Sequence, residues 1–140
     1  MNRLKLSELD KLSNYQDIAL FLMRVVIAGY LVINQGWPTF QNFLNGVAEF
    51  PDPLHLGSRT TMALMVFTEL ICASFVVVGL FTRLLALPVA FGFTVAVFIH
   101  HWSDPFGWKE LPSLYWVSFV AFAILGPGKY SLDYLFFKRR

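Results

Sequence analysis

Charged side chains are scarce in this sequence. Of its 140 residues, 14% are charged and 56% are hydrophobic, whereas about 25% are charged in typical soluble domains. The formal net charge is only +2, and the basic residues cluster at the ends of apolar runs, which argues against nucleic-acid binding. The composition therefore predicts an integral membrane protein, and the length suits one domain over residues 1–140.

Cysteine is nearly absent as well. The one cysteine, Cys72, lies within an apolar run, which excludes a disulfide framework, a CxxC redox pair and a cysteine zinc site within the chain. No pair of histidines falls on facing spans, as a b-type haem would need. We therefore expect no encoded haem, flavin or metal site, and we expect Cys72 to be a small buried residue.

Long apolar runs dominate what remains. Four of them approach the ~20 residues that cross the hydrocarbon core of a bilayer. They cover about Asp17–Asn34, Ser58–Gly79, Leu84–His101 and Leu111–Gly126. Because the runs are continuous and do not alternate, they predict helices and not strands. The expected fold is all-α, an integral membrane four-helix bundle, and a soluble fold with buried helices is the alternative.

Lysine and arginine are unevenly distributed over the segments between these runs. Only Arg59 and Lys109 fall on one side of the predicted membrane. The residues on the other side are Arg3, Lys5, Lys11, Arg83, Lys129, Lys138, Arg139 and Arg140. This bias predicts that the N-terminus and the C-terminus are both cytoplasmic. The expected location is the inner (plasma) membrane, as a multi-pass protein in contact with lipid.

The connections between the runs differ in kind. The link 79–83 is short, so the second and third spans are expected to be antiparallel neighbours, with Gly79 as a helix stop. The first outer loop, Gln35–Gly57, is long, and its aromatic and apolar residues recur at helical spacing. We expect part of this loop to form a helix lying in the outer interface.

Two ionisable residues fall at membrane depth. Arg24 lies in the first span and Glu69 near the centre of the second. Because a charge at mid-bilayer costs about 3 kcal/mol or more, both residues should face the bundle, where their opposite charges predict a pair. Glu69 is then a proton carrier or a ligand group in a site that includes Gln35, on the same helical stripe as Arg24. The alternative is a structural ion pair that fixes helix packing.

A second polar cluster is predicted at the outer end of the bundle. His100 and His101 end the third span, and Glu110 begins the fourth. Histidine and carboxylate together can pass protons at neutral pH. Consecutive histidines are ~100° apart on a helix, so one is expected to face inward, and the sequence leaves open which one. The spacing matches no strong metal motif, and ordinary polar residues at an interface are the alternative.

Several short motifs together resemble the DoxX family of small four-helix membrane proteins. They are Arg24, Gly36-Trp37-Pro38, Glu69-Leu70, Gly79-Leu80-Phe81-Thr82-Arg83, His100, Glu110 and Gly126-Pro127-Gly128-Lys129-Tyr130-Ser131-Leu132-Asp133. The family often has a histidine and a basic residue where this chain has Gln35 and Thr39. The family takes its name from a subunit of an archaeal thiosulfate:quinone oxidoreductase, and the resemblance implies the four-helix fold more strongly than a reaction.

The leading functional hypothesis is a membrane subunit of a quinone-linked oxidoreductase system. The expected catalytic residues are Glu69, His100 and Glu110, and the expected ligand-binding residues are Arg24, Gln35, Trp37 and His101. A quinone is the expected cofactor, and electrons would come from a protein partner. Homo-oligomer formation is also considered. The alternatives are a non-catalytic membrane scaffold that docks redox partner proteins, and a small transporter or proton path.

Overall fold

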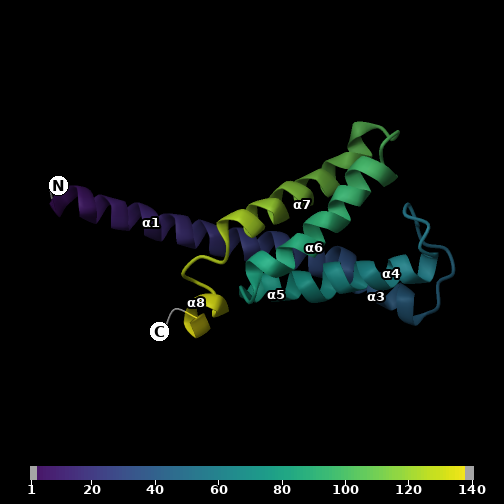
Figure 1. The fold of residues 1–140 in the computed structure, drawn as a ribbon, viewed down its shortest axis with the longest axis horizontal. Coiled ribbons are helices and arrows are strands. Elements are labelled where there is room, and N and C mark those ends of the chain that lie inside the picture. The colour runs from purple at the N-terminus through teal and green to yellow at the C-terminus, as the bar shows by residue number, and fades with distance from the viewer. Residues whose placement is uncertain (1–2, 138–140) are drawn as a thin grey trace.

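The structure is a computed structural model that describes residues 3–137, with side chains from residue 12 onward. All regular secondary structure in this part of the chain is helical, which confirms the all-α prediction (Figure 1). Part of the expected cytoplasmic charge falls outside the described side chains. The residues concerned are Arg3, Lys5, Lys11, Lys138, Arg139 and Arg140.

The first helical run continues without a break from residue 3 to residue 44. It comprises α1 (Arg3–Met23), the π-helical η1 (Arg24–Ala28), α2 (Gly29–Leu31), the π-helical η2 (Val32–Gly36) and α3 (Trp37–Leu44). The aromatic segment after Asn34 is helical as predicted, but it extends the first helix and is not a separate one. The wide turn of η2 directly precedes Pro38, whose ring would clash with a carbonyl group in a regular α-helix.

The remaining helices follow the other apolar runs closely. They are α4 (Ser58–Val66), the π-helical η3 (Phe67–Cys72), α5 (Ala73–Val78), α6 (Thr82–Val95), the π-helical η4 (Ala96–His100), α7 (Phe106–Leu125) and α8 (Leu132–Phe137). Gly79 ends α5 with a φ of 75°, and Gly126 ends α7 with a φ of 82°. Side chains disfavour this left-handed region, so glycine is the natural helix stop at both places.

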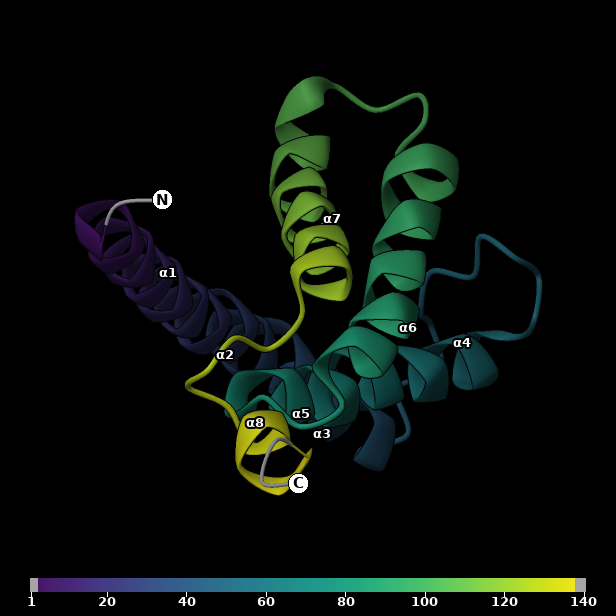
Figure 2. The ribbon, with the colours of Figure 1, turned by 60° about the vertical axis from the view of Figure 1, so that its left-hand side comes forward.

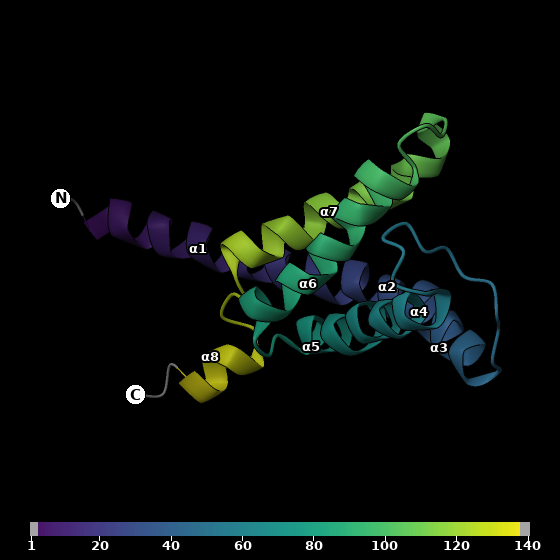
Figure 3. The ribbon, with the colours of Figure 1, turned by 45° about the vertical axis from the view of Figure 1, so that its right-hand side comes forward.

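The helices form two pairs. One pair consists of the run 3–44 and the run α4–α5, and the other of α6 and α7 (Figures 1 and 3). α5 also contacts α6, as expected of antiparallel neighbours. The two pairs lie together near residues 79–83 and 126–137, which we call the junction end. They diverge toward the loops 45–57 and 101–105, which we call the loop end (Figure 2).

Helices long and apolar enough to cross a membrane are Leu12–Leu44, Ser58–Val78 and Thr82–His100. At 33 residues, the first is about 50 Å long and exceeds the hydrocarbon thickness of about 30 Å, so it tilts or extends beyond it. α7 has 20 residues but carries Lys109 and Glu110 in its first turns. The chain is therefore a membrane protein with several apolar helices in contact with lipid.

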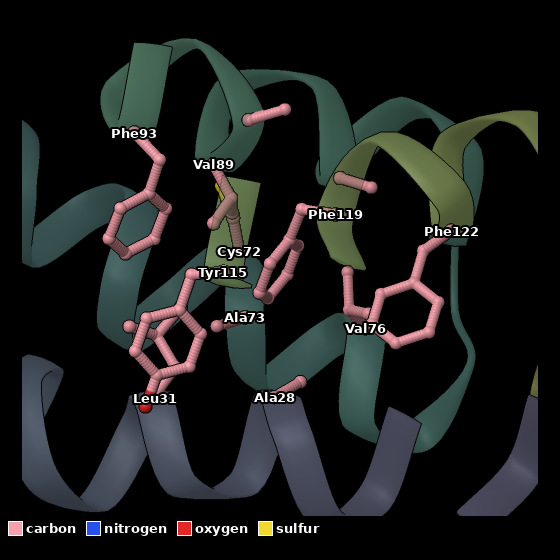
Figure 4. Packing of buried hydrophobic residues seen from close by; sticks show 12 residues of the cluster. Ala28, Leu31, Cys72, Ala73, Val76, Val89, Phe93, Tyr115, Phe119 and Phe122 are labelled. Carbon is pink, nitrogen blue, oxygen red and sulfur yellow. The ribbon is translucent and has the colours of Figure 1, made fainter. Parts of the chain in front are cut away.

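The core lies where the two pairs meet, toward the junction end (Figure 4). Small residues such as Ala28 and Ala73 bring the helices of the first pair close together, and Phe119 and Phe122 of α7 fill the space above them. Cys72 is a buried free thiol inside this core, as predicted. Large apolar side chains on the outward faces stay exposed, as expected in lipid.

Candidate functional site

A cleft of ≈ 510 Å³ opens between the two helix pairs at the loop end. Its walls come from α4 and η3 on one side and from α6 and η4 on the other, and residues of the outer loop 50–56 also line it. The lining is largely apolar, with few polar side chains. These are Gln35, Thr61, Thr68, Glu69, His100, His101 and Tyr115. A concave apolar space of this size with a few convergent polar groups is typical of a small-molecule site.

Glu69 is the buried acidic residue of the cleft. Glu69 is only 5% exposed, and its carboxyl group makes no hydrogen bond or ion pair with any residue of the segment 12–137, whose side chains the structure describes. Tyr115 on α7 is close enough to interact electrostatically with the Glu69 carboxylate. A buried carboxyl group without a partner is costly, and it is available to a ligand or a proton.

The position of Glu69 is fixed by a close approach of two backbones. A β-carbon on Gly36 of η2 would lie 2.6 Å from the carbonyl oxygen of Glu69 on η3. Only glycine permits two helices to approach so closely, and small residues at such crossings are common in membranes. The Gly36-Trp37-Pro38 motif therefore sets the register between the first two helices.

Four of the predicted site residues fall within π-helical segments. Arg24 lies in η1, Gln35 in η2, Glu69 in η3 and His100 in η4. A π-helical turn is wider than an α-helical one and changes the direction of its side chains, and such turns occur frequently at functional sites. The sequence carried no signal for these turns.

His100 and His101 both line the cleft. Their rings are in edge-to-face contact at 4.5 Å, and Nδ1 of His101 lies 2.7 Å from Oδ2 of Asp104. His101 is the better covered of the two, with 18% of its side chain exposed. The 100° separation of an ideal helix does not hold here, because the backbone leaves helical geometry at His101, with φ −93° and ψ 20°.

Asp52 anchors the outer loop beside the cleft. Its Oδ1 accepts hydrogen bonds from the Thr61 hydroxyl at 2.7 Å and the Leu56 N–H at 3.0 Å, and its Oδ2 accepts one from the Gly57 N–H at 2.6 Å. The bond from Thr61, followed by those from Gly57 and Leu56, lowers the pKa of the Asp52 carboxyl group below its usual range. Asp52 thus ties the loop to the first turn of α4.

Arg24 does not pair with Glu69, and the predicted ion pair is wrong. Arg24 is fully buried at the junction end, where its Nη2 donates a hydrogen bond to the carbonyl oxygen of Tyr130 at 2.7 Å. Its guanidinium group packs directly against Gly79. Gly79 is ten residues beyond Glu69, about 15 Å along the helix, which is too far for direct contact.

The segment 126–133 closes the junction end around Arg24. The Asp133 carboxylate accepts hydrogen bonds from the N–H groups of Phe81 at 2.8 Å and Thr82 at 3.0 Å, at the start of α6. In return, the N–H of Asp133 donates to the carbonyl oxygen of Gly79 at 2.9 Å. An acidic side chain at a helix N-terminus satisfies free N–H groups and complements the helix dipole.

Lys129 adds a second attachment to the first helix. Its N–H donates to Oδ1 of Asp17 at 3.1 Å, and its ammonium group lies 3.2 Å from Oδ2 of the same residue. The ammonium group also donates to the Ser13 hydroxyl at 3.1 Å. These hydrogen bonds and contacts define a set of residues that we call the clasp, which consists of Asp17, Arg24, Gly79, Lys129, Tyr130 and Asp133. The motif 126–133 therefore has a structural role in joining α1, α5 and α6.

Besides Arg24, two predicted site residues lie outside the cleft. Trp37 is 51% exposed on α3, where its ring lies at a tilt against that of Phe40, with the ring centroids 5.9 Å apart. Glu110 is exposed in an early turn of α7. Five residues correspond to 500°, so Glu110 lies about 140° around the helix from Tyr115, which marks the buried face.

Tyr115 is the main site residue that the sequence reasoning missed. It is 7% exposed, lines the cleft, and stacks on Phe93 at 5.1 Å. Its signal was present in the sequence, because Tyr115, Phe119 and Phe122 recur at the spacing of a buried helix face. The sequence-based prediction grouped Glu110 with the site, which turns a different face of α7 toward the cleft and hides this pattern.

No group of three or more metal-ligating side chains comes together among residues 12–137, whose side chains the structure describes. Comparison with protein families finds a match to the DoxX family, whose model covers residues 19–102. The match extends from the first helix through the two histidines, and so includes every helix wall of the cleft except α7. No curated protein and no solved structure matches the chain.

Proposed function

The chain belongs to the DoxX family, and from that premise we propose that it is a membrane subunit of a quinone-linked oxidoreductase system. The cleft at the loop end is the proposed quinone site. The single observation that carries this proposal is Glu69, a buried carboxyl group without a hydrogen-bond partner in the described chain, which faces a largely apolar cleft. A quinone ring needs apolar walls, and its carbonyl oxygens need hydrogen-bond donors.

The side chains of the cleft fit that ligand. Phe93 and Tyr115 provide flat apolar surface, and the Tyr115 hydroxyl group is a donor for a carbonyl oxygen. Glu69 in its protonated form is a second donor. A bound quinone supplies an acceptor for two electrons and two protons. Glu69 holds a proton inside the bilayer, and His100 and His101 connect the cleft with the water at the loop end.

Electrons must reach this site from a partner protein that carries a redox group. The chain itself contributes binding, orientation and proton supply. The clasp at the junction end takes no part in this chemistry. It holds the helix ends together, about 15 Å along the helix from Glu69.

We also propose that α7 is a fourth span and that both ends of the chain are cytoplasmic, in the inner (plasma) membrane. The junction end carries Arg83 and Lys129, while Arg59 and Lys109 belong to the loop end. These two pairs balance, so the excess that supports a cytoplasmic junction end by the positive-inside rule comes from the six Lys and Arg residues in the sequence segments 1–11 and 138–140. A helix of 20 residues has the length to cross the hydrocarbon core.

Paired carboxyl variants test the quinone site. Wild-type protein in lipid nanodiscs should retain a quinone through purification and bind added quinone saturably. Glu69→Leu removes the donor and leaves a side chain of similar size that cannot form a hydrogen bond, and it should weaken binding by about tenfold, as loss of one strong hydrogen bond would. Glu110→Leu makes the same chemical change on an exposed residue outside the cleft, and it should bind quinone as wild type does.

Quinone extraction, followed by a binding titration on the three proteins, gives the readout. If wild type retains no quinone and Glu69→Leu binds added quinone as wild type does, the proposed function is wrong. An equal loss in both variants would indicate a general charge effect and would count against a site at Glu69.

A further inference from the structure

The cleft also has a mouth at the middle of the bilayer. Leu64, Phe67 and Phe91 line the cleft and are at the same time 49%, 46% and 64% exposed. Phe67 is nine residues from the start of the helix Ser58–Val78, and Phe91 is nine residues from each end of Thr82–His100. The gap between η3 and α6 therefore faces hydrocarbon at mid-depth. We call it the side mouth.

The wall beside the side mouth lacks bulk. Gly92 lies next to Phe91 on α6, and a β-carbon there would meet only the Thr68 hydroxyl, at 3.8 Å. Pro88, one turn earlier on the same helix, also lines the cleft. α6 thus carries no side chain at this point of the cleft wall, beside the Thr68 hydroxyl, and a larger residue at position 92 would occupy cleft space next to Phe91.

The mouth toward water is bordered by the outer loop. Apolar residues of the outer loop line it, including Phe50, Leu54 and Leu56. Asp52 holds this loop to α4 through its three hydrogen bonds. Entry from water passes this tethered loop, whereas the side mouth is bordered by the side chains of Phe67 and Phe91.

We propose that the ligand carries a long hydrocarbon chain and reaches the cleft sideways from the bilayer, between η3 and α6. This rests on the proposed function, because it takes a quinone ring as the group bound beside Glu69. The chain of the bound ligand extends past Phe67 and Phe91 into lipid. Each methylene of such a chain raises the partition of the ligand into the bilayer about fourfold, which favours this route over the aqueous one.

Photolabelling from the end of the chain tests the route. The probe is a benzoquinone with a ten-carbon alkyl chain that ends in a diazirine, added to wild-type protein in nanodiscs. Mass spectrometry should find the label on the peptides that contain Phe67 and Phe91, and excess unlabelled long-chain quinone should suppress it. Label on residues 50–56 instead would overturn lateral access while leaving the quinone site intact. Label that no quinone suppresses would overturn both proposals.

A pair of glycine variants tests the same route independently. Gly92→Leu places a side chain in the bare wall and should weaken binding of the long-chain quinone at least about tenfold. Gly29→Leu is the matched control, because a β-carbon on Gly29 of α2 meets nothing within 4 Å. Gly92→Ala, which makes only an ordinary contact, should give an intermediate loss and an unchanged unfolding temperature. Equal affinities for Gly92→Leu and Gly29→Leu would overturn the proposal.

Discussion

Gly36 lies where the first helical run crosses the second, and a single methyl group there tests the packing around Glu69. In Gly36→Ala, the new β-carbon would lie 2.6 Å from the carbonyl oxygen of Glu69 and 2.9 Å from the Cα of Leu70. Both are backbone atoms, which cannot turn aside as the end of a side chain can. The two helices must therefore separate.

The size of the effect follows from these distances. Carbon atoms are at their optimal separation at about 3.5–4.0 Å, so the helices have to move apart by about 0.5–1 Å. A gap of that size forfeits roughly a quarter to a half of the dispersion energy of each contact along the interface. Overpacking costs about 1–3 kcal/mol, and alanine's higher helix propensity returns up to about 1 kcal/mol, so we expect a net loss of about 1–2 kcal/mol.

Unfolding in a mixed detergent series, with helicity as the readout, measures this loss. Gly29→Ala is the control, because its β-carbon has open space and should leave stability unchanged or raise it by up to about 1 kcal/mol. Gly36→Ala should also weaken quinone binding, because the Glu69 backbone itself moves. If Gly36→Ala unfolds at the same midpoint as wild type, the close approach of η2 and η3 is not what fixes Glu69.

Two further predictions concern the clasp and the outer loop. Arg24→Gln removes the charged hydrogen bond to the Tyr130 carbonyl and should destabilise the protein by about 2 kcal/mol in the same unfolding assay. The quinone affinity of this variant should be unchanged. A tenfold loss of affinity would instead link Arg24 to Glu69. Asp52 has a lowered pKa in the folded protein, so its stabilisation of the loop is complete above the unfolded pKa of about 3.9 and is lost as the pH falls through the lowered value. Hydrogen exchange at the Leu56 and Gly57 amides, corrected for intrinsic rates, should be protected at pH 7 and faster near pH 2, and equal protection at both would contradict the role of Asp52.

The histidines and Glu110 show where reasoning from ideal helix geometry fails. The sequence placed His100 and His101 at the end of a helix correctly, but the angle between them depends on where helical geometry stops. The backbone departs from it at His101, and both rings reach the cleft. Glu110 was grouped with them because it is near in sequence, yet the buried face of α7 is set by Tyr115 and the phenylalanines after it.

The sequence by itself determined the apolar helices, the burial of Arg24 and Glu69, the helix stop at Gly79 and the family. These properties are local, because hydropathy and glycine geometry act on a segment whatever its neighbours are. Only the tertiary structure decided the partner of Arg24, the place of Tyr115 beside Glu69, and the side mouth of the cleft. The physical reason is the register between helices. Gly36 fixes the first helix against the second at Glu69, and Gly79, ten residues after Glu69, packs against the guanidinium group of Arg24. Each of these contacts joins two helices that are distant in the sequence, so no single segment reveals it.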